Sequence, residues 1–329
     1  MKVIKLDKKK RILKAITKSY DDLIILSYVI GPGDRLIAYS RRKIDVGASP
    51  EVRLVKIAIA VEKVSLEETS LGVSGKIMSS SDESVPLHKY HTIYLRPGNG
   101  FVLQKDKFLS FQGNMVLKSQ ERSPKILICV YEEGYAIFYK ITNYSLKRLY
   151  EIKESVAGKR FKNDARSKFI TRLVQQINEE YNKIKWNLVI VAGKAMDNEE
   201  LKKSMLKDLK IQYETVSYAD TGLREITSKE KISSLLKNTK IATQRNLMKD
   251  YINEISKGNP SYVYGFQKIS ERAASEKPEE ALLSKEFVLS HKELVEQLDE
   301  AGTNIIFFDE KDDSLDTLDS FGGVILKFS

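Results

Sequence analysis

A run of three cations, Arg41-Arg42-Lys43, is the strongest candidate for chemistry in this chain, and a loop of mostly small residues at 45–50 follows it. Three cations at the end of a strand, beside such a loop, can enter a groove and neutralise phosphates. Contacts of this kind supply affinity for a nucleic acid and read no base sequence. A solvated strand end explains the same residues, and the pattern alone leaves both interpretations open.

A second basic cluster begins after Gly158, whose missing side chain lets the backbone approach a partner closely. Its cations run into the start of a predicted helix: Lys159, Arg160, Lys162, Arg166 and Lys168. A nucleic-acid contact and a charged linker both account for this composition.

Asp21 and Asp22 could form part of a metal site, but acidic residues that open a helix more commonly cap its free amides and complement its dipole. A two-metal centre needs several converging carboxylates. Glu51, Glu62 and Glu67 are available for that purpose. We therefore favour capping and keep a metal pair as the alternative.

Other catalytic constellations are excluded. The single cysteine, Cys129, lies in an apolar run and is expected to be buried, and one cysteine allows neither an intramolecular disulfide nor a Cys-rich zinc site. The three histidines lack metal-ligand spacing. The run at 188–194 resembles a phosphate-binding loop superficially, but Leu188 replaces the required glycine and Ala195 the required Ser or Thr. GTP hydrolysis by this chain is not expected.

Composition favours RNA as a partner over a membrane. The 329 residues include 55 Lys and Arg against 45 Asp and Glu, a net charge of +10, and 42% of residues are apolar. That length suits two or three domains, and the positive surplus suits a polyanion. No apolar run approaches the ~20 residues of a membrane span, so we expect a soluble, cytoplasmic monomer.

Changes of pattern along the chain predict an α+β protein with three parts. Short strand-like runs with turn signals fill the first third and are typical of a small twisted barrel. After a linker at 122–125, strand-like runs, a long helix near 164–181 and a buried strand predict an α/β unit. A smaller α/β/α layer follows. The predicted domains are 1–122, 123–237 and 238–329.

Motifs spread along almost the whole chain occur in one order: Gly33-Asp34 with Arg42-Lys43-Ile44, Val73-Ser-Gly-Lys76 with Tyr90-His91-Thr92, Glu133-Gly134 with Ala136, Tyr264-Gly265 with Glu280–Leu283, and Gly322-Gly323-Val324. In this order and at these separations they resemble the archaeal Pelota family, ribosome-rescue relatives of the class-1 termination factors. Ile24 and Ala157 depart from the Trp and Pro that are usual in the family.

The resemblance implies a fold for each domain. It implies an Sm-like β-barrel at the N-terminus and a central α/β domain of the release-factor type. It also implies a C-terminal α/β/α domain, similar to ribosomal protein L30e, that binds a partner. The central domain lacks the Gly-Gly-Gln tripeptide of the release factors, and no Asn-Ile-Lys-Ser motif is present, so neither peptide hydrolysis nor codon reading is expected.

The resemblance also implies a function. The protein would recognise stalled ribosomes with an empty A site and promote their rescue in no-go or non-stop mRNA surveillance. Arg41–Lys43 would probe the decoding site, and the segment at Lys159 and Arg160, with Lys162 and Arg166, would approach tRNA or a GTPase. The implied partners are the ribosome with its rRNA, mRNA and tRNA, an elongation-factor-1α-type GTPase and an ABC-family recycling ATPase.

Two alternatives stay open. The first is a divalent-metal-dependent endoribonuclease that cleaves mRNA on stalled ribosomes, with Asp21 and Asp22 as its catalytic carboxylates. It would require a divalent cation, whereas rescue itself requires no cofactor. The second alternative is a general RNA-binding protein without a GTPase partner.

Overall fold

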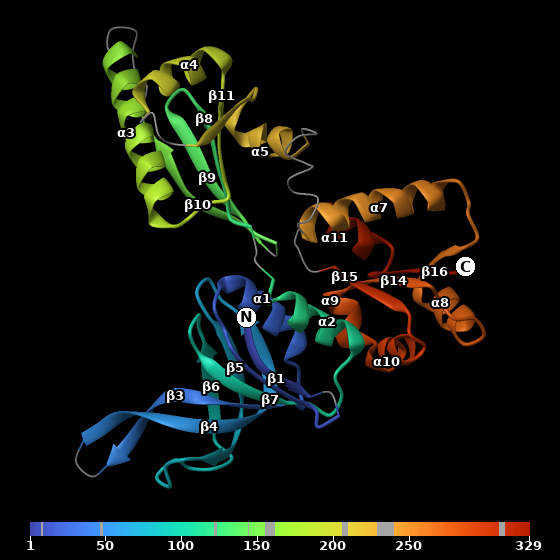
Figure 1. Ribbon diagram of the computed structural model, residues 1–329. Coiled ribbons are helices and arrows are strands. Elements are labelled where there is room, and N and C mark those ends of the chain that lie inside the picture. Colours follow the sequence, from blue (N-terminus) through green and yellow to red (C-terminus); the bar gives the residue numbers. More distant parts are fainter. Residues whose placement is uncertain are drawn as a thin grey trace. The chain divides into compact units, whose positions relative to one another are not determined.

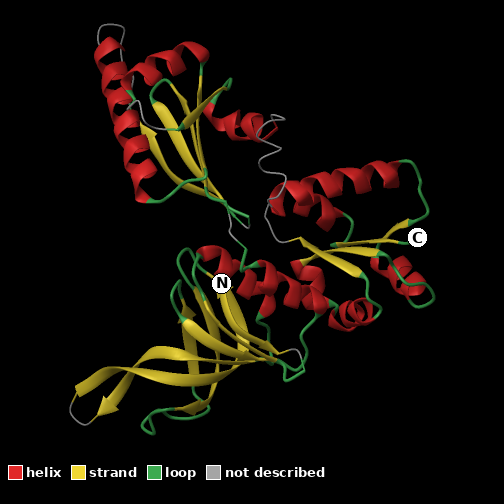
Figure 2. Cartoon of the chain, viewed as in Figure 1, coloured by secondary structure: helices red, strands yellow, loops and turns green. Residues whose placement is uncertain are grey.

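The computed structural model describes residues 1–7, 9–46, 49–121, 124–143, 145–154, 162–205, 210–228, 240–308 and 313–329. The chain divides into two compact units, one made of Met1–Arg122 with Leu247–Ser329 and the other of Ser123–Asn246. Sheets and helices occur in both, which confirms the α+β multidomain fold (Figures 1 and 2). No helix in the described ranges is long and apolar enough to cross a membrane. The exact division into three domains stays a prediction.

The first unit contains a seven-stranded antiparallel sheet with strand order β1-β2-β7-β3-β4-β5-β6. The strands are β1 (Lys2–Asp7), β2 (Ile12–Ile16), β3 (Arg35–Val46), β4 (Ser49–Leu66), β5 (Leu71–Ser80), β6 (Tyr90–Leu95) and β7 (Gly100–Gln104), and the helices are α1 (Tyr20–Val29) and α2 (Ser110–Lys118). His91 Nε2 of β6 lies 2.9 Å from Ser40 Oγ of β3. The sheet therefore curls until β3 and β6 face each other, as a small barrel requires.

Strands β3 and β4 continue beyond the rest of the sheet as a two-stranded arm. Their register is unbroken from Arg35 opposite Ala60 to Val46 opposite Ser49. The pairing of β7 with β3 ends at Ala38, and that of β5 with β4 starts at Ile57. Residues 39–46 and 49–56 therefore project as a ribbon, which Figure 1 shows clearly, and we call them the arm.

At Gly75, β5 lies too close to β4 for a side chain, since a Cβ added there would lie 1.8 Å from the carbonyl oxygen of Ala60. Gly75→Ala is expected to lower the free energy of unfolding by about 1–3 kcal/mol, because the strands would have to separate. Gly100→Ala is the matched strand control, since its Cβ would meet only Ile16 Cγ1 at 3.8 Å. Denaturant unfolding measures both, and equal stability of the two variants would contradict this packing.

The C-terminal part of the first unit is an α/β/α sandwich with strand order β13-β16-β14-β15. Its elements are β13 (Tyr262–Tyr264), β14 (Glu280–Ser284), β15 (Asn304–Phe308), β16 (Val324–Lys327), α7 (Lys240–Ser256), α8 (Phe266–Ala273), α9 (Lys285–Ser290), α10 (Lys292–Glu300) and α11 (Asp313–Ser320). A cluster around Phe287 and Val295 packs α8, α9 and α10 on one face. A cluster around Tyr251 and Leu318 packs α7 and α11 on the other.

Aromatic rings join the N-terminal and C-terminal parts of this unit. The ring centroids of Tyr28 on α1 and Phe111 on α2 lie 4.8 and 5.9 Å from that of Phe307 on β15. The Ser110 amide donates to the Asp299 carboxylate at 2.8 Å, at the start of α2. Buried apolar contact and this helix-start bond together explain why the two parts form one compact unit.

The second unit has a mixed five-stranded sheet with strand order β10-β9-β8-β11-β12. Its elements are β8 (Ile126–Glu132), β9 (Tyr135–Ile141), β10 (Leu146–Lys153), β11 (Leu188–Gly193), β12 (Ile211–Thr215), α3 (Lys162–Lys183), α4 (Ala195–Ser204) and α5 (Ala219–Ser228). Phe169 of α3 and Leu201 of α4 pack on one face, and Ile226 of α5 packs on the other. Cys129 is fully buried, as predicted.

Candidate nucleic-acid interface

The arm presents one face on which cations and apolar side chains alternate. Successive side chains of a strand point to opposite faces, and directly opposed residues of paired strands point the same way. Tyr39, Arg41 and Lys43 therefore share a face with their register partners Lys56, Leu54 and Val52 respectively. We call this set the outer face of the arm: Tyr39, Arg41, Lys43, Val52, Leu54 and Lys56.

Each cross-strand pair of the outer face combines one cation with one exposed apolar side chain. Tyr39 and Leu54 are each 64% exposed and Val52 is 57% exposed. No carboxylate belongs to these six residues. Successive pairs are two residues apart on each strand, or about 7 Å. Cations neutralise phosphates, and exposed rings or methyl groups contact bases and sugars, so the outer face suits a nucleic-acid strand.

Arg42 points to the opposite face of the arm and lies opposite Arg53. Arg53 is held by Glu51, with 2.8 Å between Nη2 and Oε2, and its Nη1 lies 3.5 Å from Asp82 Oδ2. The three cations that the sequence groups together are thus divided by the strand pleat. Arg41 and Lys43 stand together on the outer face, whereas Arg42 belongs to a face that also carries carboxylates.

The pKa of His91 depends on Arg42, on the face of the arm opposite the outer face. Its pKa is lowered, first because burial disfavours the imidazolium and then because Arg42 repels it. Arg42→Gln is expected to raise the His91 pKa part of the way toward its ordinary value of 6.5, since burial remains. Because the folded-state pKa is depressed, stability is lost as pH falls through about 6.5. NMR titration of the ring checks this, and Arg41→Gln is the control. An unchanged pKa in Arg42→Gln would contradict the placement.

The arm is longer than the sequence predicts. The loop expected at 45–50 is mostly strand, since β3 runs to Val46 and β4 starts at Ser49. Residues 47 and 48 lie outside the described residues. The cations therefore lie on a paired ribbon and not at a strand end.

The second basic cluster is described only in part. Lys159 and Arg160 lie outside the described residues, and Lys162 is described as the first residue of the α3 backbone. Arg166 Nη2 donates to Asp197 Oδ1 of α4 at 2.9 Å. This contact ties α3 to α4, so a structural role accounts for Arg166. Its role in RNA binding stays a prediction.

Asp21 and Asp22 are both buried at the start of α1. Asp22 Oδ2 accepts hydrogen bonds from the amides of Lys18 at 2.6 Å and Ser19 at 3.1 Å. Its Oδ1 accepts from the amino group of Met1 at 2.7 Å. Asp22 thus fits the capping interpretation. Within the described ranges, no group of three or more His, Cys, Asp or Glu side chains is placed to hold a metal ion.

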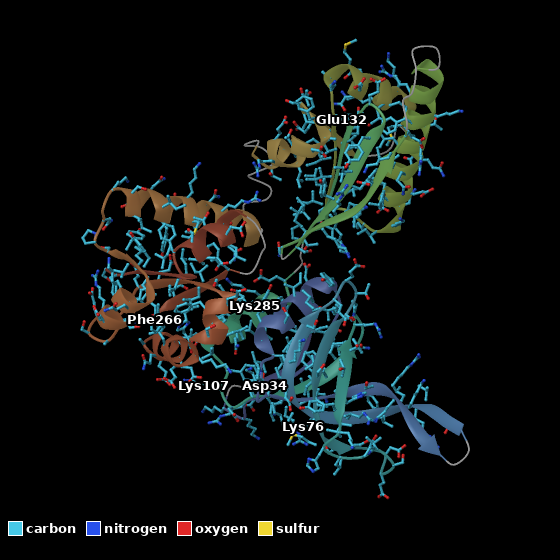
Figure 3. All side chains as sticks on the ribbon, turned by 180° about the vertical axis from the view of Figure 1, so that it is seen from behind. Asp34, Lys76, Lys107, Glu132, Phe266 and Lys285 are labelled. Carbon is cyan, nitrogen blue, oxygen red and sulfur yellow. The ribbon has the colours of Figure 1, made fainter. Side chains whose placement is uncertain are left out.

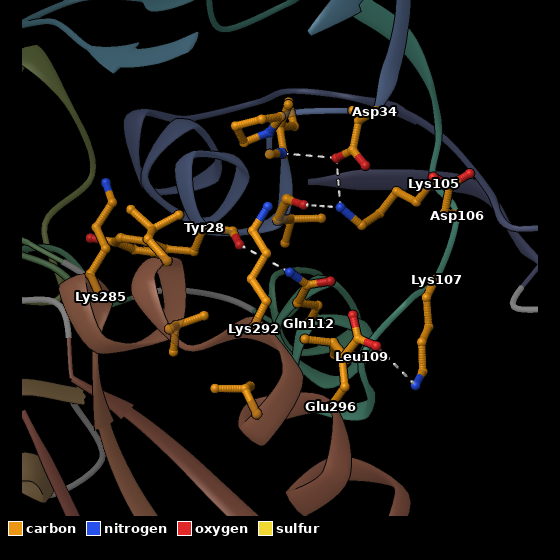
Figure 4. A pocket seen from close by; sticks show the side chains of 18 of the residues that line it. Tyr28, Asp34, Lys105, Asp106, Lys107, Leu109, Gln112, Lys285, Lys292 and Glu296 are labelled. Carbon is orange, nitrogen blue, oxygen red and sulfur yellow. Dashed lines mark hydrogen bonds and ion pairs between the residues drawn. The ribbon is translucent and has the colours of Figure 1, made fainter. Parts of the chain in front are cut away.

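A pocket of about 250 Å³ lies in the first unit, between the α1–β3 turn, the segment before α2 and helices α9 and α10 (Figure 4). A buried ion pair forms one wall. Lys105 Nζ donates to Asp34 Oδ2 at 2.6 Å and to the Val29 carbonyl at 2.7 Å. Asp34 Oδ2 also accepts from the Gly31 amide at 2.8 Å. The pair therefore fixes the turn that leads from α1 into β3.

Burial is the largest cause of the pKa shifts in this ion pair. Burial raises the pKa of Asp34 and lowers the pKa of Lys105, although each partner favours the charged form of the other. The pair consequently depends on both members, because either charge alone would be buried without compensation. The sequence pattern singled out Asp34 as part of a motif but gave no sign of its partner.

Comparison with known proteins finds similarity to archaeal Pelota proteins. The model of the Pelota N-terminal domain matches residues 1–120. The protein pelota homolog of Pyrococcus abyssi is 25% identical over 355 residues, covering 100% of this chain and 99% of that protein. The homolog of Staphylothermus marinus is 22% identical over 306 residues, and the match covers 90% of this chain and 86% of that protein. Residues 1–120 match a Pelota N-terminal domain, and the whole chain is similar to archaeal pelota homologs. The resemblance drawn from the motifs is thereby confirmed.

Solved structures of the Pelota family share the fold. The Thermoplasma acidophilum Pelota protein has a TM-score of 0.75 at 14% identity and covers 100% of this chain and 99% of its own. Dom34 of S. cerevisiae has a TM-score of 0.52 at 18% identity, covering 100% of this chain and 97% of its own. Dom34 is described as a translation termination-like factor in RNA quality control that interacts with Hbs1. The arm lies wholly within the part that matches the Pelota N-terminal domain.

Proposed function

We propose that this protein recognises stalled ribosomes with an empty A site and promotes their rescue and dissociation. The Pelota N-terminal domain match and the similarity to pelota homologs along the chain support the proposal. The observation that carries it is the outer face of the arm, a narrow ribbon whose three cations have no carboxylate among them. Such a ribbon can enter a channel between RNA strands, where a larger domain would be excluded.

We propose that partner proteins, and not this chain, hydrolyse the nucleotides. The chain lacks a phosphate-binding loop, since Leu188 and Ala195 stand at positions that require Gly and Ser or Thr. We propose an elongation-factor-1α-type GTPase for delivery and an ABC-family ATPase for subunit splitting. The interaction of Dom34 with Hbs1 supports a protein partner of this kind. Rescue itself would need no cofactor and would take place in the cytoplasm.

Binding to ribosomes with different A sites tests the recognition step. We expect tight association with ribosomes whose A site is empty, and much weaker association when a tRNA occupies that site. Arg41→Gln with Lys43→Gln should weaken association with empty-site ribosomes. Lys2→Gln with Lys14→Gln is the control, because both lysines are exposed cations on β1 and β2, away from the arm. Equal binding to empty and occupied A sites would contradict the proposal.

A further inference from the structure

Two exposed tyrosines stand on β6, beyond the arm and outside the residues that the proposed function uses. Tyr90 is 65% exposed and Tyr94 is 45% exposed. Thr92 lies between them, and the alternation of the strand places all three on one face. His91, Ile93 and Leu95 point the other way, and the last two are buried.

Cations flank both tyrosine rings. Lys76 of β5 lies directly opposite Tyr90, with its Nζ 5.7 Å from the ring centroid. The guanidinium carbon of Arg96 lies 5.9 Å from the ring centroid of Tyr94. Figure 3 shows Lys76 on this sheet. We call these four residues the tyrosine platform: Lys76, Tyr90, Tyr94 and Arg96.

The space around the rings is open. Gly72 lies opposite Tyr94, so no side chain from β5 covers that ring. Between the rings, Ser74 and Thr92 are joined by a hydroxyl–hydroxyl bond of 2.8 Å. In the part of the chain that the structure describes, neither tyrosine hydroxyl has a hydrogen-bond partner. Both rings are exposed and flanked by cations, which makes them candidates for binding.

Two carboxylates lie near the platform and do not cancel its charge. Glu62 Oε1 is 3.9 Å from Lys76 Nζ, and both side chains are about half exposed, so their attraction is weak. Glu67 Oε2 accepts a hydrogen bond from the Ser70 hydroxyl at 2.8 Å. Lys89 adds a further exposed cation next to Tyr90.

The platform is continuous with the outer face of the arm. One row of directly opposed residues crosses four strands: Arg35 on β3, Ala60 on β4, Lys76 on β5 and Tyr90 on β6. Tyr39 is four residues beyond Arg35 on the same strand and so points to the same side. Ile37, Ala58 and Ser79 are opposed in the row between, and the Arg35 guanidinium lies 3.4 Å from the Ser79 hydroxyl, so no carboxylate separates the two surfaces along these rows.

We infer that the tyrosine platform is a second contact surface for single-stranded RNA, in which unpaired bases stack on Tyr90 and Tyr94 while Lys76 and Arg96 meet the phosphates. The inference rests on the proposed function for the identity of the ligand as RNA. Stacking on a side chain needs a base whose face is free, which a duplex does not offer. The rings are about 13 Å apart along the strand, so they would hold bases that are not adjacent in a stack.

Direct binding of a short single-stranded RNA oligonucleotide, followed by fluorescence anisotropy, tests the platform. Tyr90→Ala and Tyr94→Ala are each expected to weaken binding about 5- to 150-fold, with an unchanged salt slope. Tyr90→Phe and Tyr94→Phe should bind like the unmodified protein, because the ring is kept. Leu87→Ala is the control, since Leu87 is an equally exposed apolar side chain (50%) in the β5–β6 connection.

The outcomes separate this inference from the proposed function. If the alanine variants bind RNA normally while Arg41→Gln with Lys43→Gln binds weakly, the platform is wrong and the function stands. If none of these variants alters RNA binding, both are wrong. If the alanine variants lose affinity for ribosomes but keep affinity for the oligonucleotide, the platform contacts another part of the ribosome, and the assignment to single-stranded RNA is overturned.

Discussion

Replacing Lys105 by methionine is expected to lower the free energy of unfolding by about 3–5 kcal/mol. The Lys105 side chain is 7% exposed and Asp34 is 8% exposed, with 2.6 Å between the charged atoms. Methionine keeps most of the volume but leaves the Asp34 carboxylate buried without its counter-ion. Unfolding by denaturant at neutral pH measures the loss. The loss should shrink in acid, because a protonated Asp34 needs no counter-ion.

Two further variants distinguish charge from packing. Lys107→Met removes a neighbouring cation whose partners, Glu296 and Glu300, are exposed, and it should change stability little. Asp34→Leu combined with Lys105→Met should recover much of the lost stability, since it removes both buried charges. A Lys105→Met protein as stable as the unmodified one would show that the ion pair does not hold the α1–β3 turn.

The double substitution Arg41→Gln and Lys43→Gln is expected to reduce the salt dependence of single-stranded RNA binding. Each phosphate contact on a single strand contributes about 0.7 to the slope of log affinity against log salt. Losing both contacts should therefore lower the slope by about 1.4. Titrations of an oligonucleotide at several salt concentrations measure it.

The control for this prediction is the Lys2→Gln and Lys14→Gln protein, which loses the same net charge away from the arm. It should keep the unmodified slope. A slope that falls equally in both proteins would show a general effect of net charge and would contradict a local phosphate contact on the arm.

The positions of strands with one buried face could be predicted from the sequence. Apolar alternation marks Ile12–Ile16, where Leu13 and Ala15 are buried and Lys14 is exposed. Apolar alternation fails in the arm. There the exposed face carries Arg41 and Lys43 but also the apolar Leu54, so polarity does not mark which face is exposed. The loop predicted at 45–50 is mostly strand, because cross-strand hydrogen bonding continues β3 and β4 to Val46 and Ser49.

Helix α2 was not predicted at all. It contains Gly113, which weakens a helix, and its N-cap residue Leu109 has no side chain that could cap the first turn. Its stability comes from tertiary contacts, since Phe111 packs against Phe307 nearly two hundred residues later in the chain. The local sequence around α2 cannot predict a contact with so distant a residue.

The candidate site was only partly visible in the sequence. The cations of residues 41–43 stand out as a run, but the separation of Arg42 from its neighbours follows from the pleat and from the length of β3. Tyr39 and Tyr90 look like ordinary strand residues, and their exposure is a property of the folded sheet. Tyr39 lies two residues before Arg41 on the same strand, and this spacing is the signal that could have indicated the outer face.

Splitting of ribosomes stalled with an empty A site, by the purified protein together with its GTPase and ATPase, tests the central claim most directly. The same reaction reports the integrity of the mRNA. The account predicts separated subunits and intact mRNA, with splitting reduced in the protein carrying Arg41→Gln and Lys43→Gln. Metal-dependent cleavage of the mRNA that requires Asp21 or Asp22, without splitting, would contradict it and would make this protein a nuclease.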